Sequence, residues 1–195
     1  MVHKRIKNIV SKLLSDNFYI LKKITFDYQL NNGKWVTQSR EVYNRGDGAG
    51  ILLYNKEKQT IILTRQFRMP TYMNGNADGL MVEICAGMLD EDDPISCIIR
   101  ETEEETGFKI SHVKKVYEAY TSPGVMTEKM YFFIGEYTDA MKVSIGGGVE
   151  SEHEDIEVLE MPFNDAIGML NNGDIIDART IILLQYAQIH KLLES

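Results

Sequence analysis

The sequence predicts an α/β fold that begins with a separate β-rich segment. Short runs of β-branched and aromatic residues, separated by Gly, Asn and Pro, recur along the chain, which is typical of strands joined by turns. Residues 94–106, 164–170 and 178–193 instead carry the boundary signals and apolar spacing of helices. Strands with a helix between them, followed by helices at the end, indicate the α/β class.

Residues 1–45 are predicted to form a β-rich arm. After an amphipathic start, residues 18–30 and 34–43 have extended, β-branched character, and the Asn-Asn-Gly at residues 31–33 is a turn signal. A hairpin or small sheet of this size has little core of its own, so we expect it to pack on another surface. The main domain is then expected at residues 46–195.

The main domain is expected to start with strands. Two short apolar runs joined by the polar residues 55–59 predict a hairpin over residues 51–64. A loop is expected at residues 69–79, which contain Pro70 and several Gly and Asn residues. The remaining strands are expected at residues 80–86, 113–120, 129–137 and 156–161, and the closing helices at residues 164–170 and 178–193.

Composition limits the classes of function. The 195 residues, 44% of them hydrophobic, suffice for a sizeable core in one domain, with or without a small appendage. A formal charge of −8 argues against a nucleic-acid partner, but not against a small phosphorylated ligand. No apolar run is long enough for a membrane span and residues 1–5 do not lead into a signal-peptide core, so we expect a cytoplasmic protein without a membrane partner. Cys85 and Cys97 lack metal-ligand spacing and are expected to be small buried or half-buried residues.

Boundary signals predict a helix between Asp93 and Gly107. Asp93 is a good N-cap, Pro94 suits the first helical position, and Gly107 adopts a left-handed conformation at little cost. Helical spacing places apolar side chains on one side, where they can be buried, and acidic side chains on another. The first group comprises Ile95, Ile98, Ile99 and Thr102, and the second comprises Glu101, Glu104 and Glu105.

The acidic side of this helix has two interpretations. Like charges three or four positions apart repel by about 0.2–0.5 kcal/mol per pair even on an exposed helix. A divalent cation such as Mg²⁺ or Mn²⁺, which prefers carboxylate oxygens and water, would turn this repulsion into ligation. Composition alone favours instead an acidic face that is exposed to solvent.

The spacing within residues 100–108, Arg-Glu-Thr-Glu-Glu-Glu-Thr-Gly-Phe, favours the metal interpretation. With Gly87, it resembles the second half of the Nudix box: Arg-Glu, an apolar residue, any residue, Glu-Glu, any residue, Gly and an apolar residue. Asp93 and Thr102 depart from that pattern, which has a glutamate and an aliphatic residue at those places. The resemblance implies a mixed β-sheet sandwiched between α-helices. It also implies a Mg²⁺-dependent hydrolase, with Mn²⁺ as a substitute, that acts on a pyrophosphate bond.

Further segments narrow the resemblance. Residues 39–43, 65–68, 122–124, 146–150 and 154–157 are similar to the GDP-mannose pyrophosphatases of the ADP-ribose pyrophosphatase branch. Members split GDP-mannose into GMP and mannose 1-phosphate, and the branch dimerises by exchanging N-terminal arms, so the resemblance implies both for this chain. Two alternatives stay open. One is an ADP-ribose pyrophosphatase, since the box contacts only the diphosphate and its metal, and the other is a nucleotide-sugar sensor without catalysis.

The resemblance also implies residue roles. The candidate catalytic residues are Arg100, Glu101, Glu104, Glu105 and Glu154, and the implied metal ligands are Glu101, Glu105, Glu154 and the backbone carbonyl of Ala86. Glu104 is either a ligand or the acceptor that orients Arg100. The candidate general base is Glu154, with Glu152 or another acid of residues 146–157 as the alternative, and a mobile loop could bring it over the metal.

Substrate contacts are implied on several segments. Phe18 suits stacking on guanine, although an aromatic side chain is more often part of a core. The alternative for Arg68 is an ordinary charge at a strand end, and the alternative for His153 is a solvated side chain. The implied substrate contacts are Phe18, Arg40, Glu41, Arg68, Ala86, Gly87, Met88, Glu128, His153 and Arg179. If arm residues line the pocket, an exchanged homodimer would make each site a composite of two chains.

Overall fold

The computed structural model describes residues 5–149, 151 and 153–193, which form two compact units. One unit contains the chain up to residue 47 together with residues 120–129, and the other contains residues 48–119 and the chain from residue 130 onward. The domain boundary expected between residues 45 and 46 stays a prediction. In the described part of the chain, no helix is long and apolar enough to cross a membrane.

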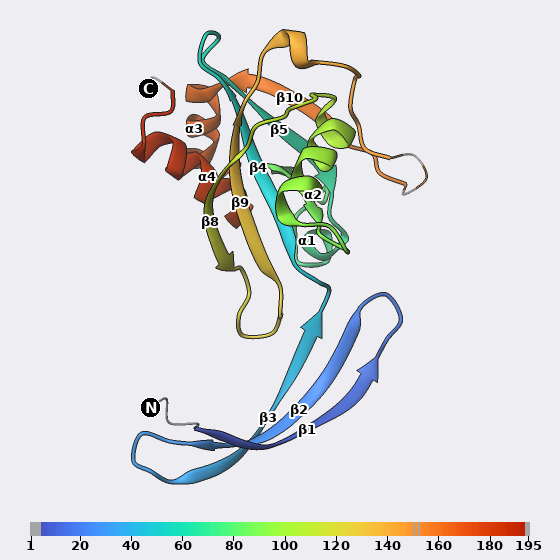
Figure 1. The fold of residues 1–195 in the computed structure, drawn as a ribbon, viewed down its shortest axis with the longest axis vertical. Helices are drawn as coiled ribbons and strands as arrows, with labels where there is room; N and C mark the ends of the chain where they lie inside the picture. The colour runs from blue at the N-terminus through green and yellow to red at the C-terminus, as the bar shows by residue number, and fades with distance from the viewer. Residues whose placement is uncertain (1–4, 150, 152, 194–195) are drawn as a thin grey trace. The chain divides into compact units, whose positions relative to one another are not determined.

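The first unit is built on a three-stranded antiparallel sheet, drawn in blue in Figure 1. It consists of β1 (Ile6–Ser15), β2 (Ile20–Gln29) and β3 (Trp35–Asn44), so the amphipathic start of the arm is a strand. Between β2 and β3, Gly33 has a φ of +83° and its N–H donates to the Leu30 carbonyl. The predicted turn is therefore confirmed.

Strand β1 exposes apolar side chains. Ile9, Val10 and Leu13 are 64%, 62% and 52% exposed. No residue of β1, β2 or β3 is fully buried. The sheet lacks a core of its own, as expected for so few strands.

The second unit is built on a seven-stranded mixed sheet, whose strands are β4 (Gly48–Asn55), β5 (Thr60–Phe67), β6 (Leu80–Glu83), β7 (Cys85–Met88), β8 (Lys114–Tyr120), β9 (Lys129–Glu136) and β10 (Glu157–Pro162). Five of them follow each other in the order β10-β5-β4-β9-β8, while β6 pairs with β5 and β7 pairs with β4. Strand β4 is antiparallel to β5 and parallel to β9, so the sheet is mixed and the predicted hairpin is confirmed.

The strand expected at residues 80–86 is divided into two. In β6, Glu83 lies opposite Thr64 of β5, whereas in β7, Ala86 lies opposite Gly50 of β4. Ile84 separates the two strands and is 1% exposed. The chain therefore changes its partner strand at a core residue just before it reaches the acidic helix.

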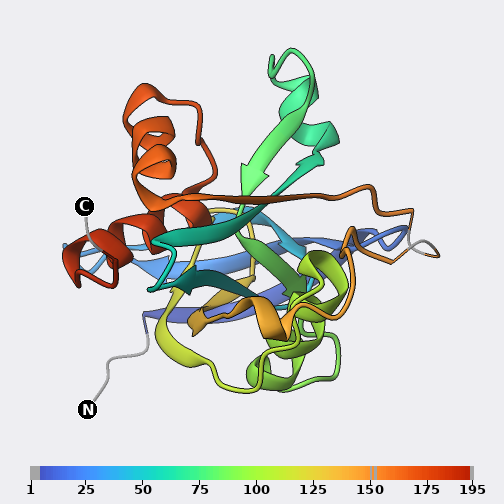
Figure 2. The ribbon, with the colours of Figure 1, turned by 90° about the horizontal axis from the view of Figure 1, so that it is seen from above.

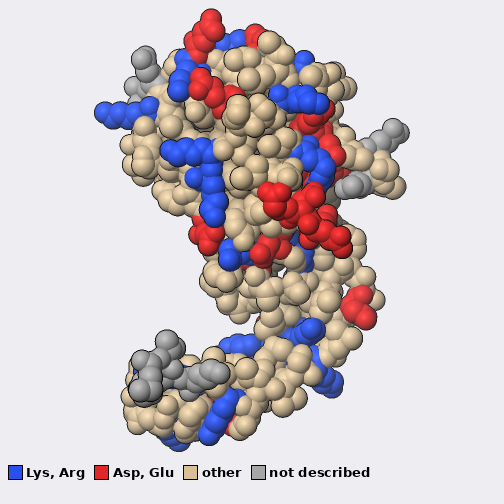
Figure 3. All heavy atoms as spheres, viewed as in Figure 1, with Lys and Arg blue, Asp and Glu red and all other residues tan. Residues whose placement is uncertain are grey.

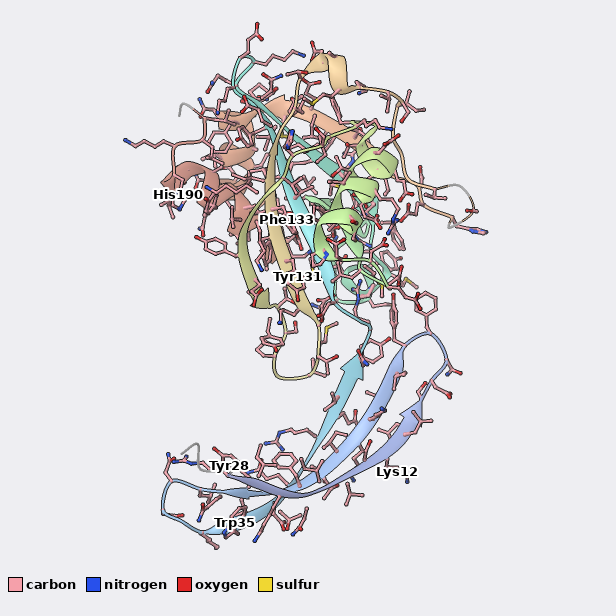
Figure 4. All side chains as sticks on the ribbon, viewed as in Figure 1. Lys12, Tyr28, Trp35, Tyr131, Phe133 and His190 are labelled. Atoms are coloured by element: carbon pink, nitrogen blue, oxygen red, sulfur yellow. The ribbon has the colours of Figure 1, made fainter. Side chains whose placement is uncertain are left out.

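Helices cover both faces of this sheet, as Figures 1 and 2 show. The helices are α1 (Met69–Met73), α2 (Pro94–Glu101), α3 (Phe163–Asn172) and α4 (Ala178–Ile189). Leu52 and Phe132 belong to the core under α3 and α4, whereas Ile51 and Phe133 belong to the core under α2. Figure 4 labels Phe133 on β9. The expected mixed sheet between helices is confirmed.

Three details differ from the sequence predictions. Residues 69–79, expected as a loop, include the short helix α1, which has a proline in its first turn. Helix α4 ends at Ile189 instead of residue 193, and Lys191 beyond it has a left-handed φ of +50°. Ile95, expected to be buried, is 50% exposed because it lies in the first turn of α2. Both cysteines are buried free thiols, as predicted.

The two isoleucines of α2 provide a test of this packing. Ile98→Ala should lower the free energy of unfolding by about 2–5 kcal/mol, because removing a fully buried side chain leaves a cavity. Ile95→Ala should change it by about 0.5 kcal/mol or less, because Ile95 is half exposed. Urea unfolding followed by circular dichroism measures both changes, and equal losses would contradict the packing.

Candidate active site

Local signals position the acidic helix. The Asp93 side chain accepts hydrogen bonds from the backbone N–H groups of Ile95 at 3.0 Å and Ser96 at 3.3 Å, which confirms the predicted N-cap. After Glu101 the helix continues as a π-helical turn, Thr102–Thr106, and it ends at Gly107 with a left-handed φ of +76°. The predicted start and end are confirmed, whereas the π-helical turn was not foreseen.

Thr102 occupies the place where the box usually has an aliphatic residue. Its side chain is fully buried, and its hydroxyl donates to the Ile98 carbonyl at 2.6 Å. The Thr106 hydroxyl likewise donates to the Thr102 carbonyl at 2.5 Å. Such bonds to the carbonyl four residues earlier compete with the regular helical bonds and accompany the change to π-helical geometry here.

The carboxylates of this helix lie in different environments. Glu105 is 2% exposed and accepts the backbone N–H of Ala86 at 3.2 Å. Glu101 packs against Gly87, where an added Cβ would lie 2.0 Å from the Glu101 carboxyl carbon, so a side chain there would displace the Glu101 carboxylate. Arg100 Nη1 lies 2.9 Å from a carboxylate oxygen of Glu101 and 2.9 Å from one of Glu104.

The sequence left two roles open for Glu104, a metal ligand or the acceptor that orients Arg100. In this structure Glu104 accepts a hydrogen bond from Arg100. Asp92 lies 3.4 Å from the same guanidinium. Figure 3 shows Asp and Glu side chains gathered on the face of the second unit where α2 lies. The acidic face is therefore partly buried and paired instead of fully solvated.

Burial changes the protonation of two of these groups. It raises the pKa of Glu105 to about 8 and that of Glu101 to about 7. The charge of Glu154 adds to both increases, while Arg100 partly offsets the increase at Glu101. Near neutral pH Glu105 is therefore largely protonated and Glu101 partly protonated, and a bound cation would displace these protons.

The donor set fits a hard divalent cation. Among the residues that the structure describes, no three Asp, Glu, His or Cys side chains are close enough to form a complete metal site by themselves. Mg²⁺, however, commonly binds through only one or two carboxylates, with water and substrate phosphates completing its coordination. Glu101 and Glu105 supply such a pair, with pKa values raised by burial.

The glycine-led segment after β9 contacts the end of the acidic helix. Gly147 N–H donates to the Glu105 carbonyl at 2.9 Å, and Gly148 N–H donates to the Glu104 carbonyl at 3.1 Å. These two bonds satisfy backbone acceptors that the helix end leaves without a helical partner. Gly146 has a φ of +71°, and an added Cβ there would lie 2.5 Å from the Glu105 carbonyl oxygen.

The same segment holds the late carboxylate. Glu154 accepts the backbone N–H of Val149 at 2.9 Å. Within residues 146–157, the alternative base Glu152 lies outside the described residues, as does Glu150, and His153 is exposed. The first residues of this loop, which was expected to be mobile, are therefore hydrogen-bonded to the helix end. The charge of Glu154 in the same loop helps to raise the pKa values of Glu101 and Glu105.

A second cluster, which the sequence analysis missed in part, surrounds Glu83. Arg68 and Arg179, both predicted substrate contacts, lie with their Nη2 atoms 2.7 Å and 3.1 Å from the same Glu83 oxygen. Glu83 itself was not predicted to belong to the site. The signal available in the sequence was one acidic residue inside the apolar run at residues 80–86.

Most of the remaining predicted contacts belong to the first unit. Phe18 is 85% exposed, which excludes its alternative role as a core residue, and its ring makes an edge contact with Tyr19. Arg40 and Glu41 are exposed. Glu128 is 7% exposed, lies 3.3 Å from Arg45 Nε and accepts the Thr121 hydroxyl at 2.9 Å. Met88, beside Gly87 in the second unit, is half-buried.

Two models of known protein families match this chain. The family model of the NUDIX domain matches residues 44–184, and the model of the GDP-mannose pyrophosphatase NudK N-terminal domain matches residues 5–43. The chain therefore belongs to the NUDIX family, as its box predicted.

Individual relatives indicate a more specific similarity than the family models do. A protein of Enterobacter sp. (strain 638) named GDP-mannose pyrophosphatase is 53% identical over 97% of this chain and 98% of its own length. Proteins of the same name from Pectobacterium atrosepticum and Salmonella typhimurium are 55% and 50% identical, over 92% and 95% of this chain and 92% and 96% of their own lengths. The chain is thus similar to proteins of this name from the arm to the last helix.

The raised pKa of Glu105 predicts a pH dependence of stability. The folded-state pKa of about 8 exceeds the ordinary value of 4.5, so this contribution to stability is complete below pH 4.5 and is lost as the pH rises through 8. Without divalent cations, the wild-type chain should lose roughly 2–4 kcal/mol of unfolding free energy over this range through Glu105. Glu105→Gln, which stays neutral, should lose less.

Urea unfolding in a chelator, at several pH values between 4.5 and 8.5, measures the difference. Adding Mg²⁺ at pH 8 should restore stability to the wild-type chain more than to Glu105→Gln. Identical pH profiles for the two chains would show that the buried carboxyl does not titrate in this range.

Proposed function

We propose that this chain is a metal-dependent hydrolase that cleaves the pyrophosphate bond of a nucleotide sugar. The proposed substrate is GDP-mannose, and the products are GMP and mannose 1-phosphate. The single observation that carries the proposal is the pair of carboxylates on a NUDIX-family helix, of which Glu105 is buried and Glu101 partly buried. The relatives named GDP-mannose pyrophosphatase, which match nearly the whole chain, support the choice of substrate.

The diphosphate link carries negative charge that repels an attacking water or hydroxide. We propose that Glu101, Glu105, Glu154 and the Ala86 carbonyl hold Mg²⁺, or Mn²⁺ as a substitute. When bound, such an ion neutralises charge on the diphosphate and lowers the pKa of a water molecule. The protein is then left mainly with positioning and proton transfer.

The side chains divide these tasks. Arg100 holds the carboxylates of Glu101 and Glu104 in place through its hydrogen bond and ion pairs. Glu154, held by the Val149 N–H, is the proposed general base that accepts a proton from the attacking water. Arg68 and Arg179 are the proposed donors to phosphate oxygens, because a guanidinium matches the geometry of a phosphate.

The first unit is proposed to bind the nucleotide part of the substrate. Phe18 exposes an aromatic ring suited to stacking, and Arg40 and Glu41 expose polar groups. We also propose a homodimer with exchanged arms, since β1 exposes Ile9 and Val10, and apolar surface of this kind is stabilised by a partner. A cytoplasmic location is part of the proposal and suits the two free thiols.

A substrate panel tests the proposal. With Mg²⁺ present, GDP-mannose should give GMP and mannose 1-phosphate faster than ADP-ribose or other nucleotide sugars give their products. Faster hydrolysis of ADP-ribose would reassign the substrate. Thermal stabilisation by GDP-mannose without any GMP release would instead identify a sensor.

Two variants of the same helix test the chemistry. Glu105→Gln should lower kcat at least about 100-fold, because it removes a proposed metal ligand from a buried position. Glu103→Gln is the matched control, since its side chain is 42% exposed and pairs with Lys109. Nearly wild-type turnover by Glu105→Gln would contradict the proposed metal site.

A further inference from the structure

Glu83 is an acidic side chain enclosed within the second unit. It ends strand β6, and its side chain is 3% exposed. A buried carboxylate is costly unless charged partners and hydrogen bonds compensate for the water it has lost. Its neighbours therefore decide what it does.

Two arginines supply these partners. Arg68 donates from Nε to Glu83 Oε1 at 3.1 Å and from Nη2 to Oε2 at 2.7 Å, which is the forked arrangement typical of a strong Arg–carboxylate pair. Arg179 Nη2 lies 3.1 Å from the same Oε2. One carboxylate thus bridges two guanidinium groups, and both of its oxygens are engaged.

Secondary structure brings the three residues together. Arg68 directly follows β5, the strand on which Thr64 lies opposite Glu83. Arg179 lies in the first turn of α4, where the N-cap Asp177 accepts its Nε–H at 3.0 Å. Next to it, the Thr180 hydroxyl accepts the backbone N–H of Ile84 at 2.8 Å and so ties the start of α4 to the chain beside Glu83.

The two arginines remain partly accessible. Their side chains are 36% exposed for Arg68 and 20% exposed for Arg179, whereas the Glu83 side chain is covered. Among the described residues, Arg68 Nη1 makes no hydrogen bond. The bridge therefore fixes one edge of the Arg68 guanidinium and leaves its other edge accessible.

The bridge lies next to the carboxylate cluster in the sequence. Ala86, whose N–H binds the Glu105 carboxylate, is three residues after Glu83. A short segment of main chain thus connects the group that holds the arginines to the group that contacts the proposed metal ligand. A diphosphate that spans both places would meet the guanidinium groups on one side and the carboxylate cluster on the other.

We propose that Glu83 is a positioning residue, which holds Arg68 and Arg179 in the orientation that binds the diphosphate of the substrate. This inference rests on the proposed function. Glu83 does not contact the substrate, because both of its oxygens bind arginine. Its contribution is preorganisation, since two long side chains that are already fixed lose less conformational entropy when the anion binds.

Glu83→Gln tests this role through the separation of KM from kcat. The amide keeps the shape but removes the charge and one acceptor, so KM for GDP-mannose should rise roughly tenfold or more while kcat changes by less than about threefold. The matched control is Glu136→Gln, which likewise ends a strand of the same sheet, is 49% exposed and pairs with Lys56. That variant should keep both constants. Wild-type KM in Glu83→Gln, or a fall in kcat alone, would overturn the proposal.

A double-variant cycle separates positioning from a general structural role. If Glu83 acts through Arg68, Glu83→Gln should raise KM much less in an Arg68→Ala background than in the wild-type chain. If the Glu83 and Arg68 substitutions raise KM by independent factors, the proposal is overturned. Should Glu83→Gln fail to fold, Glu83→Asp replaces it in the same cycle, because it keeps the charge but withdraws it by one methylene.

Hydrolysis by the wild-type chain distinguishes failure of the proposed function from failure of the positioning role. If it hydrolyses no nucleotide sugar in Mg²⁺, the proposed function fails, whatever the variants do. If it hydrolyses one and the Glu83 variants leave KM unchanged, only the positioning role fails. Hydrolysis with the expected change in KM supports both.

Discussion

The requirement to keep several carboxylates close together, with one of them buried, governs the rest of the second unit. The N–H of Ala86 donates to the Glu105 carboxylate, and a side chain at residue 87 would displace Glu101 from its position against the strand. The N-cap at Asp93 and the left-handed Gly107 determine where the helix begins and ends. The buried side chain of Ile98 packs the helix against the sheet. Backbone N–H donors and apolar packing thus offset the unfavourable energy of holding these carboxylates close together.

One short segment, residues 83–88, connects all of these features. Glu83 binds the arginines, Ile84 enters the core beneath α3 and α4, and Ala86 and Gly87 contact the acidic helix. The change of partner strand at Ile84 makes this possible, because each half of the segment follows a different neighbour in the sheet. One continuous segment therefore contacts both the arginine pair and the acidic helix, an arrangement that favours precise relative positioning of the two groups.

Local signals in the sequence predicted those parts of the fold that depend on nearby residues. The limits of the acidic helix, which comprises α2 and the π-helical turn after it, followed from Asp93, Pro94 and Gly107, and the hairpin of β4 and β5 followed from two apolar runs around a polar turn. The π-helical turn, the division of the strand at Ile84 and the helix α1 depend on packing and side-chain bonds between distant segments, which no local pattern encodes. In the site, the box located the carboxylates, but the bridge at Glu83 joins residues that are 15 and 96 positions apart and therefore appears only in three dimensions.

The docking of the glycine segment onto the helix end has a consequence for how this region can diversify. Gly147 donates to the Glu105 carbonyl and its own carbonyl accepts the N–H of Ile156, so both ends of the intervening loop are fastened at one point. Insertions or deletions between these ends change the length of the loop without shifting the strand that follows it. Related sequences can therefore vary in loop length here, whereas Gly146, with no room for a methyl group, has little freedom to mutate.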